Sequence, residues 1–172
     1  MKLENVVCSG TFNQELDLHA LASQCKCAVY GKNRYPAAYL KFDNHSVTVY
    51  RTGKYIMPGM KSFDDVTNTF DKMKEILFPF TDTSLFSEPE VRNIVCSSQT
   101  SHELNLGTLY LELVSRDMDV VYEPEAFPGL ILKTKDCTYN VFSSGKFLIL
   151  GCTSVSQAEI AEYFFLNLID HQ

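Results

Sequence analysis

The sequence repeats itself, and this repeat limits the possible folds more than any other feature. Residues 5–9 (NVVCS) are matched by residues 93–97 (NIVCS), an offset of 88 residues. Farther along, residues 49–54 (VYRTGK) are matched by residues 141–146 (VFSSGK), an offset of 92. The matching blocks keep the same order in both halves, which indicates two copies of one structural unit. We expect the first copy in residues 1–86 and the second in residues 87–172.

Each half has the same predicted order of elements: strand, helix, strands, helix. The first strand, at 5–9 or 93–97, leads into a stretch of helical leucine spacing at 16–24 or 104–115. Alternating runs follow around 35–42, 47–51 and 55–57, and Thr52-Gly53 and Ser144-Gly145 are hairpin turn signals. The last helix is capped by Ser62 in the first half and by Ser154 or Ser156 in the second. Its apolar face is predicted to comprise Val66, Phe70, Met73 and Leu77 in the first half, and Ile160, Tyr163, Phe164, Leu168 and Ile169 in the second.

This order of elements predicts an α+β fold. Two such halves would bury their apolar sheet edges by joining into one pseudo-twofold antiparallel sheet with helices on one face. The opposite face would stay uncovered, and uncovered sheet faces that carry aromatic residues are usually binding surfaces.

Composition is typical of a globular chain and excludes several classes of protein. Hydrophobic residues make up 45% of the sequence and charged residues 21%. No apolar run approaches the roughly 18 residues of a membrane span, and the N-terminal residues lack the apolar core of a signal peptide. We therefore expect neither a membrane protein nor a secreted one.

The sequence predicts neither an enzyme nor a metal protein. Of the six cysteines only Cys25 and Cys27 are close in sequence, and a C-x-C pair without a second pair is a poor metal signature. The four histidines lie at non-equivalent places in the two halves, and phosphate-binding glycine loops are absent. We therefore expect no catalytic residue, no metal and no other cofactor.

The motifs of the second repeat resemble those of the TATA-box-binding protein family. They are residues 122–131 (YEPEAFPGLI) and 140–146 (NVFSSGK), and the looser first-repeat counterparts are 32–38 (KNRYPAA) and 50–54 (YRTGK). The resemblance covers nearly the whole chain. It implies a two-repeat saddle, a curved antiparallel sheet with its helices on the convex face. It also implies a general transcription initiation factor that binds the minor groove of T/A-rich promoter DNA through the concave face and bends it by aromatic wedge insertion.

The resemblance also implies the DNA-binding residues, motif by motif. The wedges are Phe127 and Phe142 in the second repeat, and Tyr35 and Tyr50 in the first. Two central asparagines donate hydrogen bonds to base acceptors, since the minor groove offers mainly adenine N3 and thymine O2. These asparagines are Asn5 and Asn93, accompanied by Val7, Val95, Ile56 and Leu148 on the apolar floor, by Thr48 and Asn140, and by a basic rim of Arg34, Lys41, Lys54, Lys133 and Lys146.

The sequence departs from the family pattern at several of these places. Pro58 and Leu150 stand where the family usually has threonine, whereas Thr48 and Asn140 stand where it usually has apolar residues. Thr153 replaces the second-repeat lysine that matches Lys61. These exchanges move hydrogen-bonding groups along the groove, so the preferred DNA sequence stays open.

Charge differs between the halves. Residues 1–86 carry +1 (10 Lys and Arg against 9 Asp and Glu), and residues 87–172 carry −7 (5 against 12). The net charge of −6 argues against tight nonspecific DNA binding, although a basic concave rim is compatible with it.

Partners and location follow from the resemblance. Glu123 and Glu125 lie on the loop that corresponds to the family's contact for a TFIIB-like factor, and a TFIIA-like factor would bind the first repeat. The first interpretation places the protein in a nucleus; the alternative is the cytoplasm if the source is archaeal or viral. The alternative function is a protein-interaction module of the same fold that has lost DNA binding. Such a module would carry acidic residues and paired polar groups on the concave face instead of wedges and a basic rim.

Overall fold

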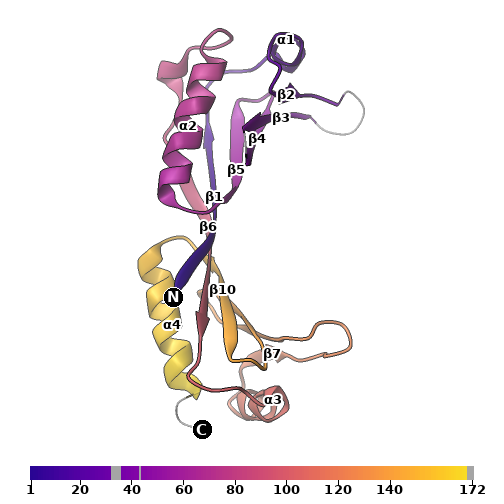
Figure 1. Cartoon of the computed structure of the whole chain (residues 1–172), viewed down its shortest axis with the longest axis vertical. Coiled ribbons are helices and arrows are strands. Elements are labelled where there is room, and N and C mark those ends of the chain that lie inside the picture. The colour runs from indigo at the N-terminus through magenta and orange to yellow at the C-terminus, as the bar shows by residue number, and fades with distance from the viewer. Residues whose placement is uncertain (32–35, 43, 170–172) are drawn as a thin grey trace. The chain divides into compact units, whose positions relative to one another are not determined.

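The computed structural model describes residues 1–31, 36–42 and 44–169 and divides into two compact units (Figure 1). The N-terminal unit comprises Asn5–Arg92, and the C-terminal unit comprises Met1–Glu4 together with Asn93–Gln172. The repeat boundary between residues 86 and 87 stays a prediction from the sequence.

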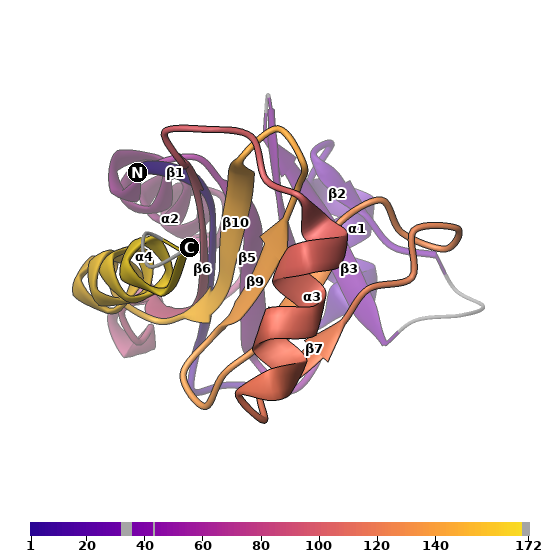
Figure 2. The ribbon, with the colours of Figure 1, turned by 90° about the horizontal axis from the view of Figure 1, so that it is seen from below.

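Each unit contains antiparallel strands in an equivalent order. In the N-terminal unit the order is β2-β3-β4-β5-β1, and in the C-terminal unit it is β6-β10-β9-β8-β7. Figure 2 shows β6, β10 and β9 of the C-terminal unit side by side in this order. The strands are β1 (Lys2–Thr11), β2 (Ala28–Val29), β3 (Ala37–Phe42), β4 (His45–Tyr50), β5 (Lys54–Met60), β6 (Glu90–Gln99), β7 (Asp119–Val121), β8 (Leu130–Lys133), β9 (Thr138–Val141) and β10 (Lys146–Cys152).

The two short helices begin two residues later than the leucine spacing predicts. Helix α1 (Leu18–Gln24) is capped by Asp17, whose side chain accepts hydrogen bonds from the backbone N–H groups of His19 and Ala20. Helix α3 (Leu106–Ser115) is capped in the same way by Asn105. Leu16 and Leu104, counted as helical from the sequence, are buried residues that precede each cap, as in a hydrophobic staple.

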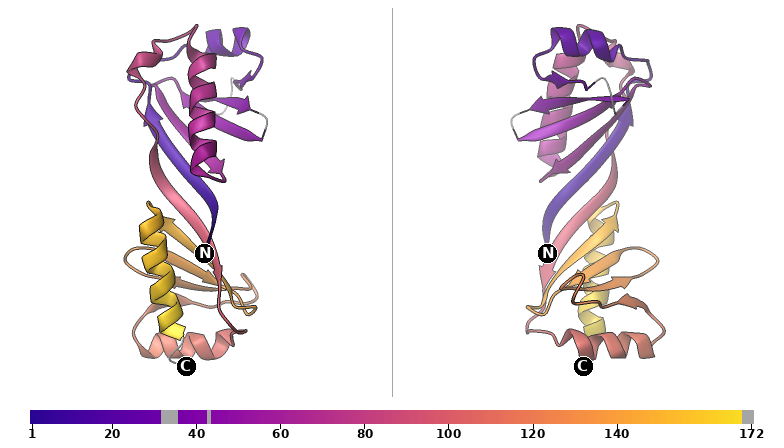
Figure 3. Two further views of the ribbon diagram at one scale, coloured as in Figure 1. Left: turned by 60° about the vertical axis from the view of Figure 1, so that its left-hand side comes forward. Right: turned by 90° about the vertical axis from the view of Figure 1, so that its right-hand side faces the viewer.

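The two long helices each pack on one face of their own unit (Figure 3). Helix α2 (Phe63–Leu77) is capped by Ser62, and helix α4 (Val155–Ile169) has the hydroxyl of Ser154 accepting the N–H of Gln157 at 3.2 Å. A 3-10 turn, η1 (Thr83–Leu85), follows α2. The predicted buried face of α2 is confirmed, since Val66, Phe70, Met73 and Leu77 are all buried.

The predicted buried face of α4 is confirmed at Ile169 and wrong at three other positions. Ile160, Tyr163 and Phe164 are 70%, 71% and 43% exposed, and the helix buries Ala158, Ala161 and Phe165 instead. The helix is apolar on most sides, so its sequence contains more than one series of apolar residues at helical spacing. Small alanines allow a close approach to the sheet, where Phe165 stacks on Tyr139 at 5.2 Å between ring centroids. The Tyr139 hydroxyl also donates to the Ala161 carbonyl oxygen at 3.0 Å.

Buried tyrosines anchor both cores. Tyr55 donates its hydroxyl to the Ser87 carbonyl oxygen at 2.9 Å, and burial raises the pKa of Tyr55 and of Tyr139 well above the usual range. Both phenols therefore stay neutral. In the described ranges no helix is long and apolar enough to cross a membrane.

Candidate nucleic-acid interface

Strand alternation gives each unit a core face and a second face, called here the open face. On β5, for example, Tyr55 and Met57 are buried against the core, whereas Lys54 and Ile56 project to the other side. The same alternation places most of the sequence-predicted DNA-binding residues on the open face of their own unit. They are Val7, Lys41, Thr48, Tyr50, Lys54 and Ile56 in the N-terminal unit, and Val95, Lys133, Asn140, Phe142, Lys146 and Leu148 in the C-terminal unit.

Strand register aligns open-face residues into one row in each unit. Thr48 pairs with Ile56, and Ile56 pairs with Ser9. In the C-terminal unit Asn140 pairs with Leu148, and Leu148 pairs with Ser97. Tyr39 and Ile131 extend the two rows by one strand. The sequence predicted no site role for Tyr39, Ile131 or the two serines, although all four lie in runs with a period of two.

Two of the predicted residues, Arg34 and Tyr35, lie outside the described residues. The other four basic residues are exposed and occur at matching places in the two units. Lys41 follows Tyr39 by two positions, and Lys133 follows Ile131 by two positions. Lys54 precedes Ile56 by two positions, and Lys146 precedes Leu148 in the same way. Each unit thus has two ammonium groups on its open face.

Phe127 and Phe142 form an aromatic pair in the C-terminal unit. Their ring centroids are 5.8 Å apart with an interplanar angle of 64°, and both side chains are partly exposed. Gly129 makes this contact possible, because a Cβ there would lie 2.7 Å from the Phe127 ring and 3.1 Å from the Phe142 ring. Gly145, with φ at +80°, closes the hairpin turn after Phe142. The sequence predicted no role for Gly129, although this glycine lies in the motif of residues 122–131.

The two asparagines differ in their hydrogen bonding. Asn93 accepts the N–H of Gly151 at 2.9 Å through its Oδ1. This orients the amide so that its NH₂ group, which finds no acceptor among the described residues, is available as a donor. The Oδ1 of Asn5 is buried and has no partner in the described part of the chain. Only Asn93 is therefore fixed by the protein in one amide orientation.

A hollow adjoins the row in each unit. The first hollow, of about 520 Å³, is bordered by Ser9, Tyr50, Lys54, Ile56, Glu90 and Arg92. The second hollow, of about 620 Å³, is bordered by the residues at equivalent repeat positions, Ser97, Phe142, Lys146, Leu148, Lys2 and Glu4.

The serine of each hollow is hydrogen-bonded to a charged side chain, and the sign of that charge differs between the two hollows. Arg92 Nε donates to Ser9 Oγ at 2.7 Å, whereas Ser97 Oγ donates to Glu4 Oε1 at 2.8 Å. Arg92 also pairs with Glu90, and Glu4 pairs with Lys2. This inversion was not predicted from the sequence, although the offset of 88 residues aligns Glu4 with Arg92.

The acidic pair of the second repeat lies in the loop before the aromatic pair. Glu123 and Glu125 are exposed, and the Glu123 carbonyl oxygen accepts the N–H groups of Ala126 and Phe127, each at 2.9 Å. The loop therefore positions Phe127 through its backbone and leaves both carboxylates in solvent.

Comparison with known proteins supports the family suggested by these features. The family model described as transcription factor TFIID (or TATA-binding protein, TBP) matches residues 1–80 and 88–171. The chain belongs to the TATA-binding protein family. It is 35% identical to TATA-box-binding protein 2 of Haloferax volcanii, over 99% of this chain and 93% of that one. It is 31% identical to the TATA-box-binding protein of Thermococcus sibiricus, over 99% and 92%.

A solved TATA-binding protein also matches in structure. The Methanococcus jannaschii TBP gives a TM-score of 0.87 at 26% identity, covering 99% of this chain and 98% of that one. The α+β class and the two-repeat TATA-binding protein fold predicted from the sequence are thereby confirmed. This is a family of DNA-binding transcription factors rather than a known family of enzymes. The relatives named here are archaeal, so the prediction of a nuclear location fits them poorly.

Proposed function

We propose that this protein is a general transcription initiation factor that binds T/A-rich promoter DNA in the minor groove through its open faces. The pairing of Phe127 with Phe142 carries this proposal, because two partly exposed rings in contact can act together as a wedge between base steps. An archaeal source, and hence a cytoplasmic location, accords with the relatives.

The chemistry of the open faces suits minor-groove recognition. The Asn93 amide presents donors, and the groove offers adenine N3 and thymine O2 as acceptors. Ile56 and Leu148 each give the open face of their own unit an apolar floor, which disfavours the guanine amino group. Four exposed lysines on the open faces supply charge for phosphates, each neutralised phosphate contributing about 0.9 to the salt slope.

The rival function is a protein-interaction module without DNA binding. That module would show acidic residues and paired polar groups in place of wedges and lysines. The open faces retain the phenylalanine pair and the four lysines. Glu4 and Glu90 at the hollows, paired with Lys2 and Arg92, are a feature that the module would share. The retained wedge and lysines favour DNA binding over the module.

The exposed carboxylates of Glu123 and Glu125 support a contact with a TFIIB-like factor. Their loop leads directly into the Phe127 wedge, so a partner bound there would lie beside the DNA that the wedge opens. A TFIIA-like factor at the first repeat is the corresponding proposal for the other half.

Selection of bound sequences from random duplex DNA, with and without a TFIIB-like partner, tests this function. We expect enrichment of T/A-rich sites, sharpened by the partner. If the protein binds the partner but enriches no sequence, the interaction module is the better description of the protein.

A further inference from the structure

Helix α4 exposes a compact apolar surface, called here the α4 patch and made of Ile160, Tyr163 and Phe164. Ile160 and Phe164 are four residues apart, so these side chains project from one side of the helix. Most of the packing against the sheet is made by Ala158, Ala161, Phe165 and Ile169. Of the three patch residues, Phe164 also contacts the sheet, since its ring centroid lies 6.4 Å from that of Tyr139. Exposed apolar patches of this kind mark interaction sites.

The equivalent surface of the first repeat is polar. The offset of 92 residues aligns the α4 patch with Asn68, Asp71 and Lys72 on α2, and all three are exposed. The repeated fold therefore does not require apolar residues at these places. The α4 patch is a property of the second repeat alone.

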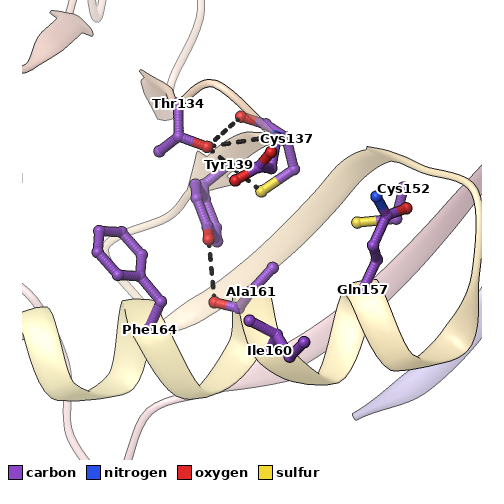
Figure 4. Close-up of a pocket in the computed structure, with 9 residues that line it drawn as sticks. Thr134, Cys137, Tyr139, Cys152, Gln157, Ile160, Ala161 and Phe164 are labelled. Carbon is purple, nitrogen blue, oxygen red and sulfur yellow. Dashed lines mark hydrogen bonds between the residues drawn. The ribbon is translucent and has the colours of Figure 1, made fainter.

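A cavity of about 320 Å³ adjoins the α4 patch (Figure 4). Ile160 and Phe164 form part of its wall, and Cys137, Tyr139 and Cys152 form the sheet side. Polar groups here are already satisfied, since the Tyr139 hydroxyl donates to Ala161 and the Thr134 hydroxyl donates to the Cys137 carbonyl oxygen at 2.8 Å. Burial, reinforced by the neighbouring Cys137, raises the pKa of Cys152 to about 11, which keeps this thiol neutral. The cavity thus suits an apolar side chain.

Charge around the α4 patch indicates the sign of its partner. Helix α4 contains Glu159 and Glu162 but no lysine or arginine, and Asp136 is exposed at the cavity rim beside Lys135. The N-terminal amino group of Met1 pairs with Glu162 at 3.1 Å, which leaves Glu159 and Asp136 to attract a partner. A second copy of the chain carries the same acids and a net charge of −6, so it would be repelled.

We propose that the α4 patch docks a basic amphipathic helix of a partner protein, with one aliphatic side chain of that helix in the cavity. Apolar residues of the partner cover Ile160, Tyr163 and Phe164, and its lysines or arginines face Glu159 and Asp136. This surface is separate from the open-face residues and from the loop of Glu123 and Glu125.

Fluorescence anisotropy with a labelled synthetic helix tests the proposal on the full chain. The probe has leucines at i, i+3, i+4 and i+7 and lysines elsewhere, and the matched control peptide replaces every lysine by glutamate. The variant Ile160→Asn/Tyr163→Asp/Phe164→Lys replaces the α4 patch by the residues that α2 has at the equivalent repeat positions. Asn68→Ala on α2 is the control variant. We expect the lysine peptide to bind wild type and Asn68→Ala equally, and to bind the triple variant at least about tenfold more weakly, a loss of about 1.4 kcal/mol.

Further readouts distinguish helix docking from misfolding of the variant and from self-association. The triple variant should keep its circular dichroism spectrum and its DNA affinity. DNA binding is measured separately from peptide binding, so a failure of the proposed DNA function can be told apart from a failure of helix docking. Equal binding by the triple variant, equal binding of the glutamate peptide, or no binding of the lysine peptide would overturn the proposal. A wild-type dimer in analytical ultracentrifugation that the triple variant abolishes would assign the surface to a second copy instead.

Discussion

The first and second hollows occupy equivalent repeat positions, yet they carry opposite charges beside the same serine. Arg92 meets Ser9 in the first, and Glu4 meets Ser97 in the second. The aromatic residues differ as well, since Tyr50 in the first corresponds to Phe142 in the second. We therefore expect different roles for the two repeats in DNA binding. The second repeat should insert an apolar wedge, and the first should attract phosphate.

The aromatic residues should give the largest difference between the halves. Replacing Phe127 and Phe142 by alanine removes two base contacts, each worth about 1–3 kcal/mol, and should weaken DNA binding roughly 100-fold. Replacing Tyr35 and Tyr50 should cost less, because each tyrosine hydroxyl must stay hydrated or find an acceptor during insertion. Anisotropy titrations of both double variants on one duplex at fixed salt check this, and equal losses would remove the asymmetry.

Exchanging the charges of the two hollows should give the second-largest change in DNA binding. Arg92→Glu should weaken DNA binding about tenfold and lower the salt slope by about 0.9 or more, whereas Glu4→Arg should tighten binding and raise the slope. Arg116→Glu, at the exposed C-cap of α3, is a matched control that should change binding little. If Arg92→Glu behaves like this control, the first hollow does not face the phosphates.

The alanine variants of Asn5 and Asn93 should differ in their free energy of unfolding. Asn93→Ala loses the hydrogen bond to Gly151 and should lower the free energy of unfolding by about 1 kcal/mol. Asn5→Ala removes a buried acceptor without a partner, so it loses no hydrogen bond and should leave the free energy of unfolding unchanged or raise it. Urea denaturation of the two variants measures both values. Equal destabilisation would mean that Asn5 is hydrogen-bonded in solution.

The smallest change in binary DNA binding is expected from Glu123→Lys/Glu125→Lys. The variant should bind DNA as well as wild type or slightly better, because the added positive charges are attracted to phosphates. Recruitment of a TFIIB-like factor, followed by gel shift, should be lost. Loss of the binary complex would instead assign the loop to DNA binding or to positioning of Phe127.

The internal repeat predicted the order of elements because a duplicated pattern supplies each element twice. The wedges, floor residues and lysines came from the family resemblance, and strand alternation brings the described ones to one face of each unit. Neither the repeat nor the resemblance predicted the full buried face of α4, where Ala158 and Ala161 pack and larger apolar residues stay exposed. Packing selects the side that fits the sheet, and hydrophobicity alone does not reveal it.

The charge inversion at the hollows was missed for a different reason. Motif comparison directs attention to residues that agree with a family, whereas Glu4 and Arg92 matter because they disagree between repeats. Aligning the two halves at the offset of 88 residues would have identified them. Their hydrogen bonds to Ser97 and Ser9 depend on contacts within the folded units and could not be read from the sequence.

Energy transfer across an end-labelled T/A-rich duplex tests the central claim most directly. We expect saturating wild-type protein to shorten the end-to-end distance of the DNA, because wedge insertion kinks the duplex. The Phe127→Ala/Phe142→Ala variant, added at its own saturating concentration, should shorten it much less. An unchanged distance with wild-type protein, when anisotropy shows the same duplex to be fully bound, would contradict minor-groove binding by aromatic insertion.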